Sequence, residues 1–412
     1  MSSSREITAL SPDSNNLKGK LAILGGSPAF ADKIHVGRPN IGDRTRLIER
    51  LDRILDTRWL SNGGPFVQEF EQRIADAVGV KHCIAMCNAT VALEIAIRAL
   101  ELKGEVIVPS LTFIATAHAL QWQEITPVFC DVDETTHNID CRKIKPLITP
   151  RTTAILAVHL WGRPCDIDDL QAIADEHGLK LLFDAAHAFG CRYQGRKIGG
   201  FGHAEVFSFH ATKFVNSGEG GAVVTNDDVL AARIRLMKNF GFSDYDKVIY
   251  IGTNGKMNEI CAAMGLTNLE SLETFIHTNR TNFEVYHESL RDIPGLSLLK
   301  YNEADSPNYQ YLVLEIDSRE FGLKRDQLLA VLHAENVLAR RYFYPGVHRM
   351  EPYRSRPAGV ALPATERIVD RVLHLPTGTG VSPVDIETIC GIIRAAVENR
   401  AEIRRAAPTT TG

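Results

Sequence analysis

The chain has 412 residues, more than one hydrophobic core usually serves, so we expect a large domain and a smaller one. Hydrophobic residues make up 44% and charged residues 23% of the chain, and the formal net charge is -4, which disfavours nucleic-acid binding. Residues 1–16 are polar and Ser-rich, without the apolar run that a signal peptide or membrane span needs. We therefore expect a cytoplasmic protein that does not contact a membrane.

Between about residue 80 and residue 226, short apolar runs alternate with helical patterns. We expect strands at residues 106–108, 127–130, 154–160, 180–183, 205–209 and 222–225. Several of these are apolar throughout, as strands covered on both faces of a mainly parallel sheet must be. Helical periodicity over residues 167–177 ends at Gly178, a favourable C-cap. The repeated units predict a three-layer α/β/α large domain.

The pattern changes near Lys256. A long helical pattern runs from residue 257 toward residue 292 with a break, and we then expect a strand at 309–315, a helix at 325–335, a strand at 337–344 and an amphipathic helix at 383–400. This mixture predicts a smaller α/β domain that closes over the large one. We place a flexible tail at residues 1–20, the large domain at 21–275 and the small C-terminal domain at 276–412.

Lys213 lies in a glycine-bounded connection between two predicted strands. Burial disfavours the ammonium form and lowers a lysine pKa, which makes the amine a Schiff-base nucleophile. Considered alone, an ordinary surface lysine is the commoner explanation. Asp184 changes that balance because it ends the strand at 180–183, and parallel sheets bind ligands at the carboxyl ends of their strands. A carboxylate there can keep the ring nitrogen of pyridoxal protonated, so that the ring acts as an electron sink.

Other residues offer contacts to such a cofactor, each with a plainer alternative. His187 is a candidate to hydrogen-bond the phenolic oxygen of the cofactor, and its alternative role is that of a buried histidine of the core. For Asp184 the alternative role is to cap the N-terminus of a helix. Ala89 and Thr90 begin a helical pattern whose N-terminus would bind a phosphate. Ser208 adds a hydroxyl to the same phosphate or is a plain turn serine.

Phe113 follows the strand at 106–108 and can stack on a pyridine ring, although core packing is the commoner role of such a residue. The phosphate loop, the aromatic residue, the carboxylate and the lysine follow one another along the chain, each at the end of a predicted strand. A Rossmann dehydrogenase needs a G-x-G-x-x-G turn, which the early Gly25-Gly26-Ser27-Pro28 does not supply. The eight cysteines lack paired metal-ligand spacing, so we expect buried thiols and no metal site.

Three segments carry a resemblance to a known family: Ser208-Phe209-His210-Ala211-Thr212-Lys213, Asp184 with His187, and Trp59-Leu60-Ser61-Asn62-Gly63-Gly64-Pro65. From about Leu21 onward the chain resembles the DegT/DnrJ/EryC1/StrS sugar aminotransferases. Residues 87–90, 159–165 and 342–348 are most similar to the members that aminate C4 of dTDP-4-keto-6-deoxyglucose. The resemblance implies the aspartate-aminotransferase-type fold of pyridoxal-phosphate enzymes (fold type I) and a homodimer whose active sites lie at the subunit interface.

The resemblance also implies roles for single residues. Lys213 would hold pyridoxal 5'-phosphate as a Schiff base, with Asp184 at the ring nitrogen, His187 beside the ring and Phe113 stacked on it. Ala89, Thr90 and Ser208 would hold the phosphate, and Asn254 would reach the phosphate in the neighbouring subunit. A loop asparagine that merely favours a turn is the alternative for Asn254. Tyr344 and His348 are candidates for contacting the sugar nucleotide, with packing as the alternative.

The implied reaction moves an amino group from L-glutamate to C4 of dTDP-4-keto-6-deoxy-D-glucose and gives dTDP-4-amino-4,6-dideoxy-D-glucose, with Lys213 as both acid and base. Amination at C3, amination of the keto-inositol scyllo-inosose, and a catalytically inactive sugar-binding regulator are the alternatives. The pair Lys213 and Asp184 and the absence of a basic recognition segment argue against the regulator. A family branch with histidine in place of the lysine performs dehydration, and the presence of Lys213 disfavours it.

Overall fold

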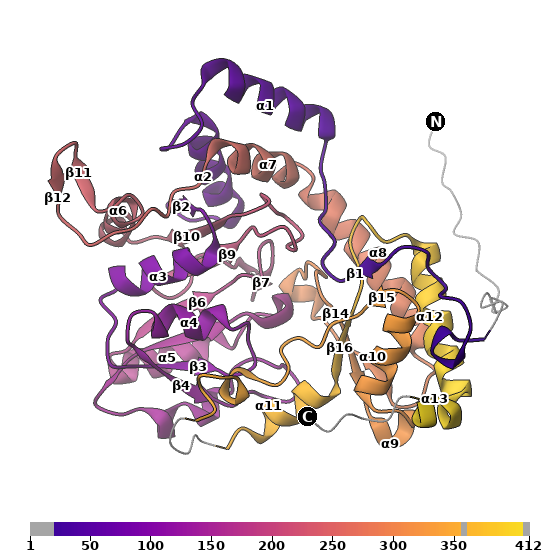
Figure 1. Cartoon of the computed structure of the whole chain (residues 1–412). Helices are drawn as coiled ribbons and strands as arrows, with labels where there is room; N and C mark the ends of the chain where they lie inside the picture. Colours follow the sequence, from indigo (N-terminus) through magenta and orange to yellow (C-terminus); the bar gives the residue numbers. More distant parts are fainter. Residues whose placement is uncertain (1–19, 356–360, 407–412) are drawn as a thin grey trace.

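A seven-stranded sheet forms the core of the larger part of the molecule, on the left in Figure 1. The structure is a computed structural model that describes residues 20–355 and 361–406. The strands of this sheet are, in spatial order, β2 (His82–Met86), β10 (Gly221–Thr225), β9 (Ala204–Ser208), β6 (Lys180–Asp184), β5 (Thr152–Val158), β3 (Glu105–Pro109) and β4 (Thr126–Cys130). Neighbouring strands are parallel from β4 to β9, whereas β10 runs antiparallel to β9 and β2. The six predicted strands are all present within two residues of their predicted ends, and β2 was not predicted.

Helices cover both faces of this sheet. Successive residues of one strand alternate between two buried clusters: Leu181 and Phe183 pack on one face, and Leu182 packs on the other. The first face is covered by α2 (Pro65–Val78), α5 (Ile167–His177) and α7 (Glu259–Leu269), and the second by α3 (Ala89–Ala99), α4 (Ala115–Gln121) and α6 (Asp228–Met237). The strands are apolar throughout because both faces are buried, and the predicted three-layer α/β/α arrangement is confirmed.

Local sequence signals explain where the helices begin and end. α5 has the predicted bounds and ends at Gly178, whose φ of 63° suits glycine. α2 starts with Pro65 in its first turn. The buried carboxylate of Glu259, at the start of α7, accepts hydrogen bonds from the backbone N–H groups of Phe66 (2.8 Å) and Val67 (3.0 Å). These bonds satisfy donors at the N-terminus of α2 and join the two helices.

The C-terminal part has its own antiparallel sheet, ordered β13 (Leu296–Leu298), β14 (Leu312–Ile316) and β16 (Val372–Leu375). This sheet packs with α8 (Leu272–Leu290), α10 (Arg325–Ala334) and α12 (Pro383–Glu398) around a separate apolar cluster. Of the strand predicted at 337–344, only β15 (Val337–Leu338) forms, and the chain beyond it turns toward the large sheet.

The division at residues 21–275 and 276–412 remains a prediction. α8 crosses its boundary, with Phe275 in the large cluster and Tyr286 in the C-terminal one. Leu21 and Ile34 also pack in the C-terminal cluster, and β1 (Ile34–His35) pairs with β15. Because of this packing, we propose that residues 21–35 belong to the small domain rather than to the large one.

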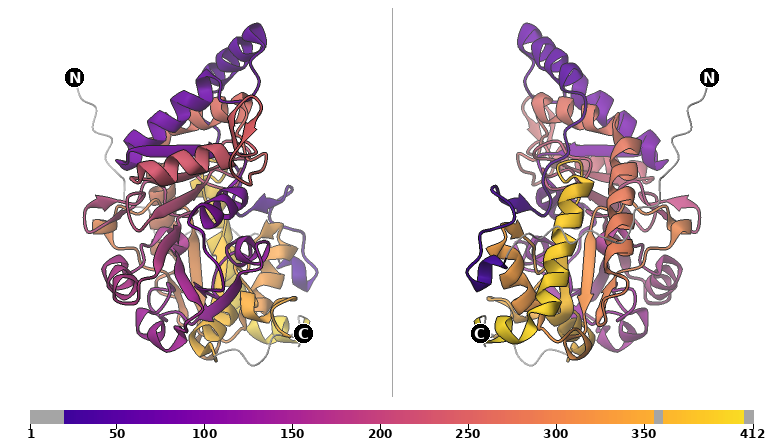
Figure 2. Two further views of the ribbon diagram at one scale, coloured as in Figure 1. Left: turned by 90° about the vertical axis from the view of Figure 1, so that its left-hand side faces the viewer. Right: turned by 90° about the vertical axis from the view of Figure 1, so that its right-hand side faces the viewer.

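Two segments extend away from the rest of the molecule: α1 (Arg44–Thr57) and the hairpin of β11 (Phe242–Asp244) and β12 (Lys247–Val248) (Figures 1 and 2). The shorter elements are β7 (Arg192–Tyr193), β8 (Arg196–Lys197), α9 (Ser318–Phe321), α11 (Pro363–Arg371), α13 (Arg400–Ala406), and the 3-10 helices η1 (Ala22–Leu24), η2 (Cys141–Lys143), η3 (Lys145–Leu147), η4 (Leu160–Gly162), η5 (Glu303–Asp305) and η6 (Val347–Arg349). Within residues 20–355 and 361–406, no helix combines the length and apolar character needed to cross a bilayer.

Candidate active site

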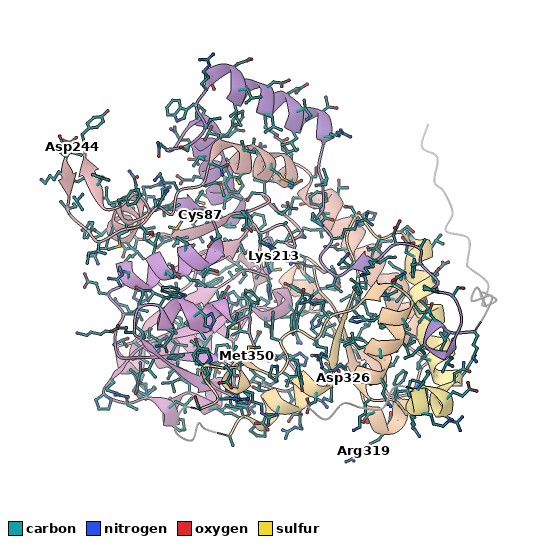
Figure 3. The ribbon with its side chains drawn as sticks, viewed as in Figure 1. Cys87, Lys213, Asp244, Arg319, Asp326 and Met350 are labelled. Atoms are coloured by element: carbon teal, nitrogen blue, oxygen red, sulfur yellow. The ribbon has the colours of Figure 1, made fainter. Side chains whose placement is uncertain are left out.

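A cavity of about 810 Å³ opens at the carboxyl ends of the central strands. Val158, Asp184 and Ser208, the last residues of β5, β6 and β9, line it together with Cys87, which follows β2. Figure 3 shows Lys213 near the centre of the molecule, and Cys87 and Lys213 both line the cavity. The C-terminal part supplies the facing wall, made of Tyr311, Arg340, Tyr342 and Phe343. The cavity therefore lies between the two parts of the chain, as small-molecule sites commonly do.

The amine of Lys213 is held inside this cavity. Its Nζ donates a hydrogen bond to the hydroxyl of Tyr311 at 3.1 Å. Burial lowers the pKa of Lys213 to about 8, although the negative charge of Asp184 opposes that shift. At neutral pH a larger fraction of this amine is therefore uncharged than in an ordinary lysine, and an uncharged amine is the form that attacks a carbonyl or accepts a proton.

Asp184 presents a buried carboxylate to the same cavity and is 6% exposed. One oxygen accepts a hydrogen bond from the Thr116 hydroxyl (2.8 Å) and the other from the Ala186 backbone N–H (3.1 Å). Burial raises the pKa of Asp184, while these two bonds and nearby Lys213 act in the opposite direction. A carboxylate held so firmly in an apolar site favours a cationic partner beside it.

His187 is buried and neutral. Its Nδ1 accepts a hydrogen bond from the backbone N–H of Trp161 at 3.3 Å, which assigns the ring proton to Nε2. Burial holds the pKa of His187 well below its usual value, and the charge of Lys213 adds to this effect. The rings of Trp161 and Phe343 lie nearly parallel to the imidazole, at 5.9 Å and 6.1 Å between centroids. His187 is therefore a fixed hydrogen-bond donor at the cavity wall.

The N-terminus of α3 points at the cavity with unpaired backbone donors. The Asn88 side chain caps the N–H of Val91 at 2.9 Å, which leaves the N–H groups of Ala89 and Thr90 for an anion. Gly221 has no side chain at this point, and a Cβ there would lie 2.4 Å from the backbone nitrogen of Ala89. The Ser208 hydroxyl lines the same region. The structure thus brings together the three residues predicted to hold a phosphate.

Phe113 lines the cavity although 56% of its side chain is exposed. Its ring lies 6.0 Å from that of Phe343 at an angle of 55°. Core packing, the alternative for Phe113, does not account for an aromatic ring with more than half of its surface in contact with solvent. A free aromatic face on a cavity wall suits stacking on a planar ring.

Comparison with known proteins identifies the family. Residues 42–394 match the DegT/DnrJ/EryC1/StrS aminotransferase family. The chain belongs to this family. A solved structure of DesI in the presence of its TDP-sugar product is 52% identical, with a TM-score of 0.90 over 93% of this chain and 98% of that one. Fold type I and the assignment as an enzyme are confirmed.

Curated relatives of this aminotransferase include proteins that act on nucleotide sugars. The dTDP-4-amino-4,6-dideoxy-D-glucose transaminase of Escherichia coli is 38% identical over 85% of this chain and 95% of that protein. The GDP-perosamine synthase of Caulobacter vibrioides is 36% identical over 87% of this chain and 96% of that protein. The predicted resemblance to sugar aminotransferases is therefore confirmed.

Three predicted site residues of the aminotransferase lie outside the cavity. Asn254 is exposed, and its side chain accepts a hydrogen bond from Lys256 (2.6 Å). The ring of Tyr344 packs against the guanidinium groups of Arg325 and Arg341. The cross-subunit role of Asn254 and the substrate contact of Tyr344 therefore stay predictions.

His348 does not reach the cavity either. Its Nδ1 forms a 2.6 Å hydrogen bond with the Ser110 hydroxyl, and its Nε2 faces Glu366 at 3.5 Å. The first contact joins η6 to the residue after β3, and the second joins η6 to α11. In this structure the imidazole serves the packing of the C-terminal part against the large sheet, and the substrate contact through His348 stays a prediction.

The sequence did not predict which residues of the C-terminal part line the cavity opposite Lys213. Tyr311 and Phe343 come from strand-like segments whose pattern predicts only packing, and nothing local distinguishes them from core aromatics. Thr116, in the first turn of α4, supports Asp184 through its hydroxyl. Within the segment 342–348, Tyr342 and Phe343 line the cavity, whereas the predicted contacts Tyr344 and His348 do not.

Proposed function

We propose that this chain transfers an amino group from L-glutamate to C4 of dTDP-4-keto-6-deoxy-D-glucose, giving dTDP-4-amino-4,6-dideoxy-D-glucose, with pyridoxal 5'-phosphate as its cofactor. One observation carries the proposal: the half-buried Lys213, with its amine of lowered pKa, and the buried carboxylate of Asp184 face one cavity. The similarity to DesI and to the Escherichia coli transaminase supports the choice of nucleotide sugar.

The donor set fits this cofactor. Ala89, Thr90 and Ser208 would hold its phosphate, and Asp184 would hold its protonated ring nitrogen, which relieves the cost of burying that carboxylate. His187 would donate from Nε2 to the phenolic oxygen, and Phe113 would stack on the ring. When bound, the cofactor supplies an electron sink that stabilises the negative charge developed as the substrate loses a proton.

The residues of the chain move the proton and keep water out. With a pKa of about 8, the Lys213 amine can take a proton from Cα of glutamate and later deliver a proton to C4 of the sugar. Tyr311 holds that amine in place through its hydroxyl. The buried rings of Tyr311 and Phe343 shield this part of the cavity from solvent, which strengthens the electrostatic contacts within it.

Identification of the product tests the proposed function directly. Incubation with dTDP-4-keto-6-deoxy-D-glucose and ¹⁵N-labelled glutamate is expected to give a nucleotide sugar with ¹⁵N on C4, detected by NMR; a reaction without glutamate is the control. Label on C3, or amination of scyllo-inosose in place of the nucleotide sugar, would contradict the proposed substrate. Protein that holds the cofactor but converts neither ketone would support the inactive regulator.

We also propose a homodimer in which the two chains complete each other's sites. α1, the loop that follows it and the segment around the β11–β12 hairpin expose large apolar side chains: Leu55 at 65%, Leu60 at 51% and Ile251 at 76%. Exposed apolar groups of this size are costly in water and favour a second protein surface. Asn254 lies in the segment after the hairpin and is exposed outside its own cavity, which suits a contact with the neighbour's phosphate.

Mixing one impaired and one inactive variant tests the shared site. Asn254→Ala is expected to lower activity about tenfold, since one hydrogen bond to a charged group is lost, and Lys213→Ala abolishes it. After subunit exchange at equal amounts, activity should rise to roughly a quarter of wild type, because half of the dimers are hybrids with one complete site each. A mixture of Lys213→Ala with Asp184→Asn is the control and should not recover. No recovery with Asn254→Ala despite proven exchange would place Asn254 outside the neighbour's site.

A further inference from the structure

Arg340 brings a positive charge to the cavity wall that faces Lys213. Its side chain is exposed, and within residues 20–355 and 361–406 no carboxylate lies within ion-pair distance of it and no hydrogen bond uses its guanidinium group. The guanidinium group lies over the ring of Tyr342, with 5.4 Å between the guanidinium carbon and the ring centroid. The N–H groups of Arg340 are thus directed to solvent and to whatever enters the cavity.

Arg341, the next residue, shows that the free charge belongs to Arg340 and is not shared by its neighbour. Arg341 forms an ion pair with Asp326 at 3.2 Å and lies over the ring of Tyr344 at 4.5 Å. Arg341 does not line the cavity. Two consecutive arginines therefore have different surroundings: one is neutralised by a carboxylate, and the other keeps its charge free beside the candidate active site.

The backbone of Arg340 is fixed. It exchanges two hydrogen bonds with His374 of β16, N–H to carbonyl, at 3.1 Å and 2.8 Å. His374 is fully buried, and its ring lies 4.5 Å from that of Trp161. Trp161 in turn hydrogen-bonds His187, so one packed group of residues carries both Arg340 and the wall beside Lys213. A guanidinium group fixed at its base and supported on an aromatic face needs little reorganisation to bind a ligand.

We propose that Arg340 forms an oxyanion subsite that binds a carboxylate or phosphate group of the substrates. The inference rests on the proposed function, in which both the amino donor and the nucleotide sugar are anions. The N-terminus of α3 and Ser208 serve the cofactor phosphate, and the amine of Lys213 serves proton transfer. Arg340 is the remaining cation on the described cavity wall, and a guanidinium binds two oxygens of a carboxylate or phosphate at once.

Equilibrium binding to the holoenzyme tests the subsite and identifies its anion. The two probes are dTDP, which carries the diphosphate without the keto-sugar, and 2-oxoglutarate, which carries the carboxylates without an amine. Titration calorimetry of Arg340→Gln is expected to show a Kd about 10- to 100-fold above wild type for at least one probe, the loss typical of a charge-assisted pair of hydrogen bonds. If only the Kd for dTDP rises, the group that Arg340 binds is the diphosphate. If only the Kd for 2-oxoglutarate rises, that group is a carboxylate.

Arg341→Gln is the matched control, because it removes the neighbouring charge outside the cavity; its Kd values should stay within about threefold of wild type. Arg340→Lys, which keeps the charge but loses the paired donors, should bind between wild type and Arg340→Gln. Unchanged Kd values for both probes in folded Arg340→Gln would overturn the subsite while leaving the proposed function intact. Wild-type protein that binds neither probe would overturn both.

Discussion

Replacing Lys213 with alanine is expected to lower the rate of amino transfer by at least about a thousandfold, because the same amine serves as nucleophile and as acid–base group. No other lysine lines the cavity among the described residues. The Tyr311 hydroxyl sits 3.1 Å from the Lys213 amine, but burial raises its pKa well above the usual value, so it cannot take over as a base near neutral pH. The variant should nevertheless fold and keep its cofactor contacts at Asp184 and α3.

Three measurements check this expectation. Steady-state turnover of Lys213→Ala should fall, and a small primary amine added to the buffer should restore part of it by carrying the missing proton. Lys180→Ala is the control, since Lys180 is an exposed residue at the opposite end of β6 from Asp184. Borohydride treatment of wild-type holoenzyme followed by peptide mapping should place the cofactor on Lys213. A label on another lysine, or near-normal turnover by Lys213→Ala, would refute the assignment.

The fold of the large domain could be predicted because its signal is local. A strand buried on both faces must be apolar along its whole length, and β3, β5 and β6 each show such a run beside helical periodicity. β2 escaped prediction because its neighbour in the sheet, β10, lies more than a hundred residues away along the chain. The fold of the small domain was harder to predict, because its short strands pair with strands far away in the sequence, as β14 does with β16.

The candidate site could be predicted in part for the same reason. Asp184 and Ser208 end central strands, and a parallel sheet brings such residues to one edge. Tyr311, by contrast, meets Lys213 across 98 residues of sequence, and only the packing of the small domain creates that contact. The sequence could not predict that Tyr342 rather than Tyr344 lines the cavity, because the turn after β15 decides which ring faces it and a single turn has no periodic pattern.

Asp184→Asn is expected to lower amino transfer by about 10²- to 10⁴-fold while leaving the protein at least as stable as wild type. The side chain keeps its shape and can still accept a hydrogen bond from Thr116, but a neutral amide cannot hold a proton on the ring nitrogen of the cofactor. Burial raises the pKa of the Asp184 carboxyl, so the charged form is costly in the empty protein and its removal relieves that cost.

Opposite effects on catalysis and stability distinguish this explanation from structural damage. The thermal unfolding midpoint of cofactor-free Asp184→Asn should equal or exceed that of wild type, whereas stopped-flow measurement of the half-reaction with glutamate should show the rate loss. Asp184→Glu keeps the charge on a longer side chain and should recover part of the rate. Equal losses of rate and stability in Asp184→Asn would mean that the carboxylate maintains the fold through Thr116 and Ala186 rather than holding a cation in the cavity.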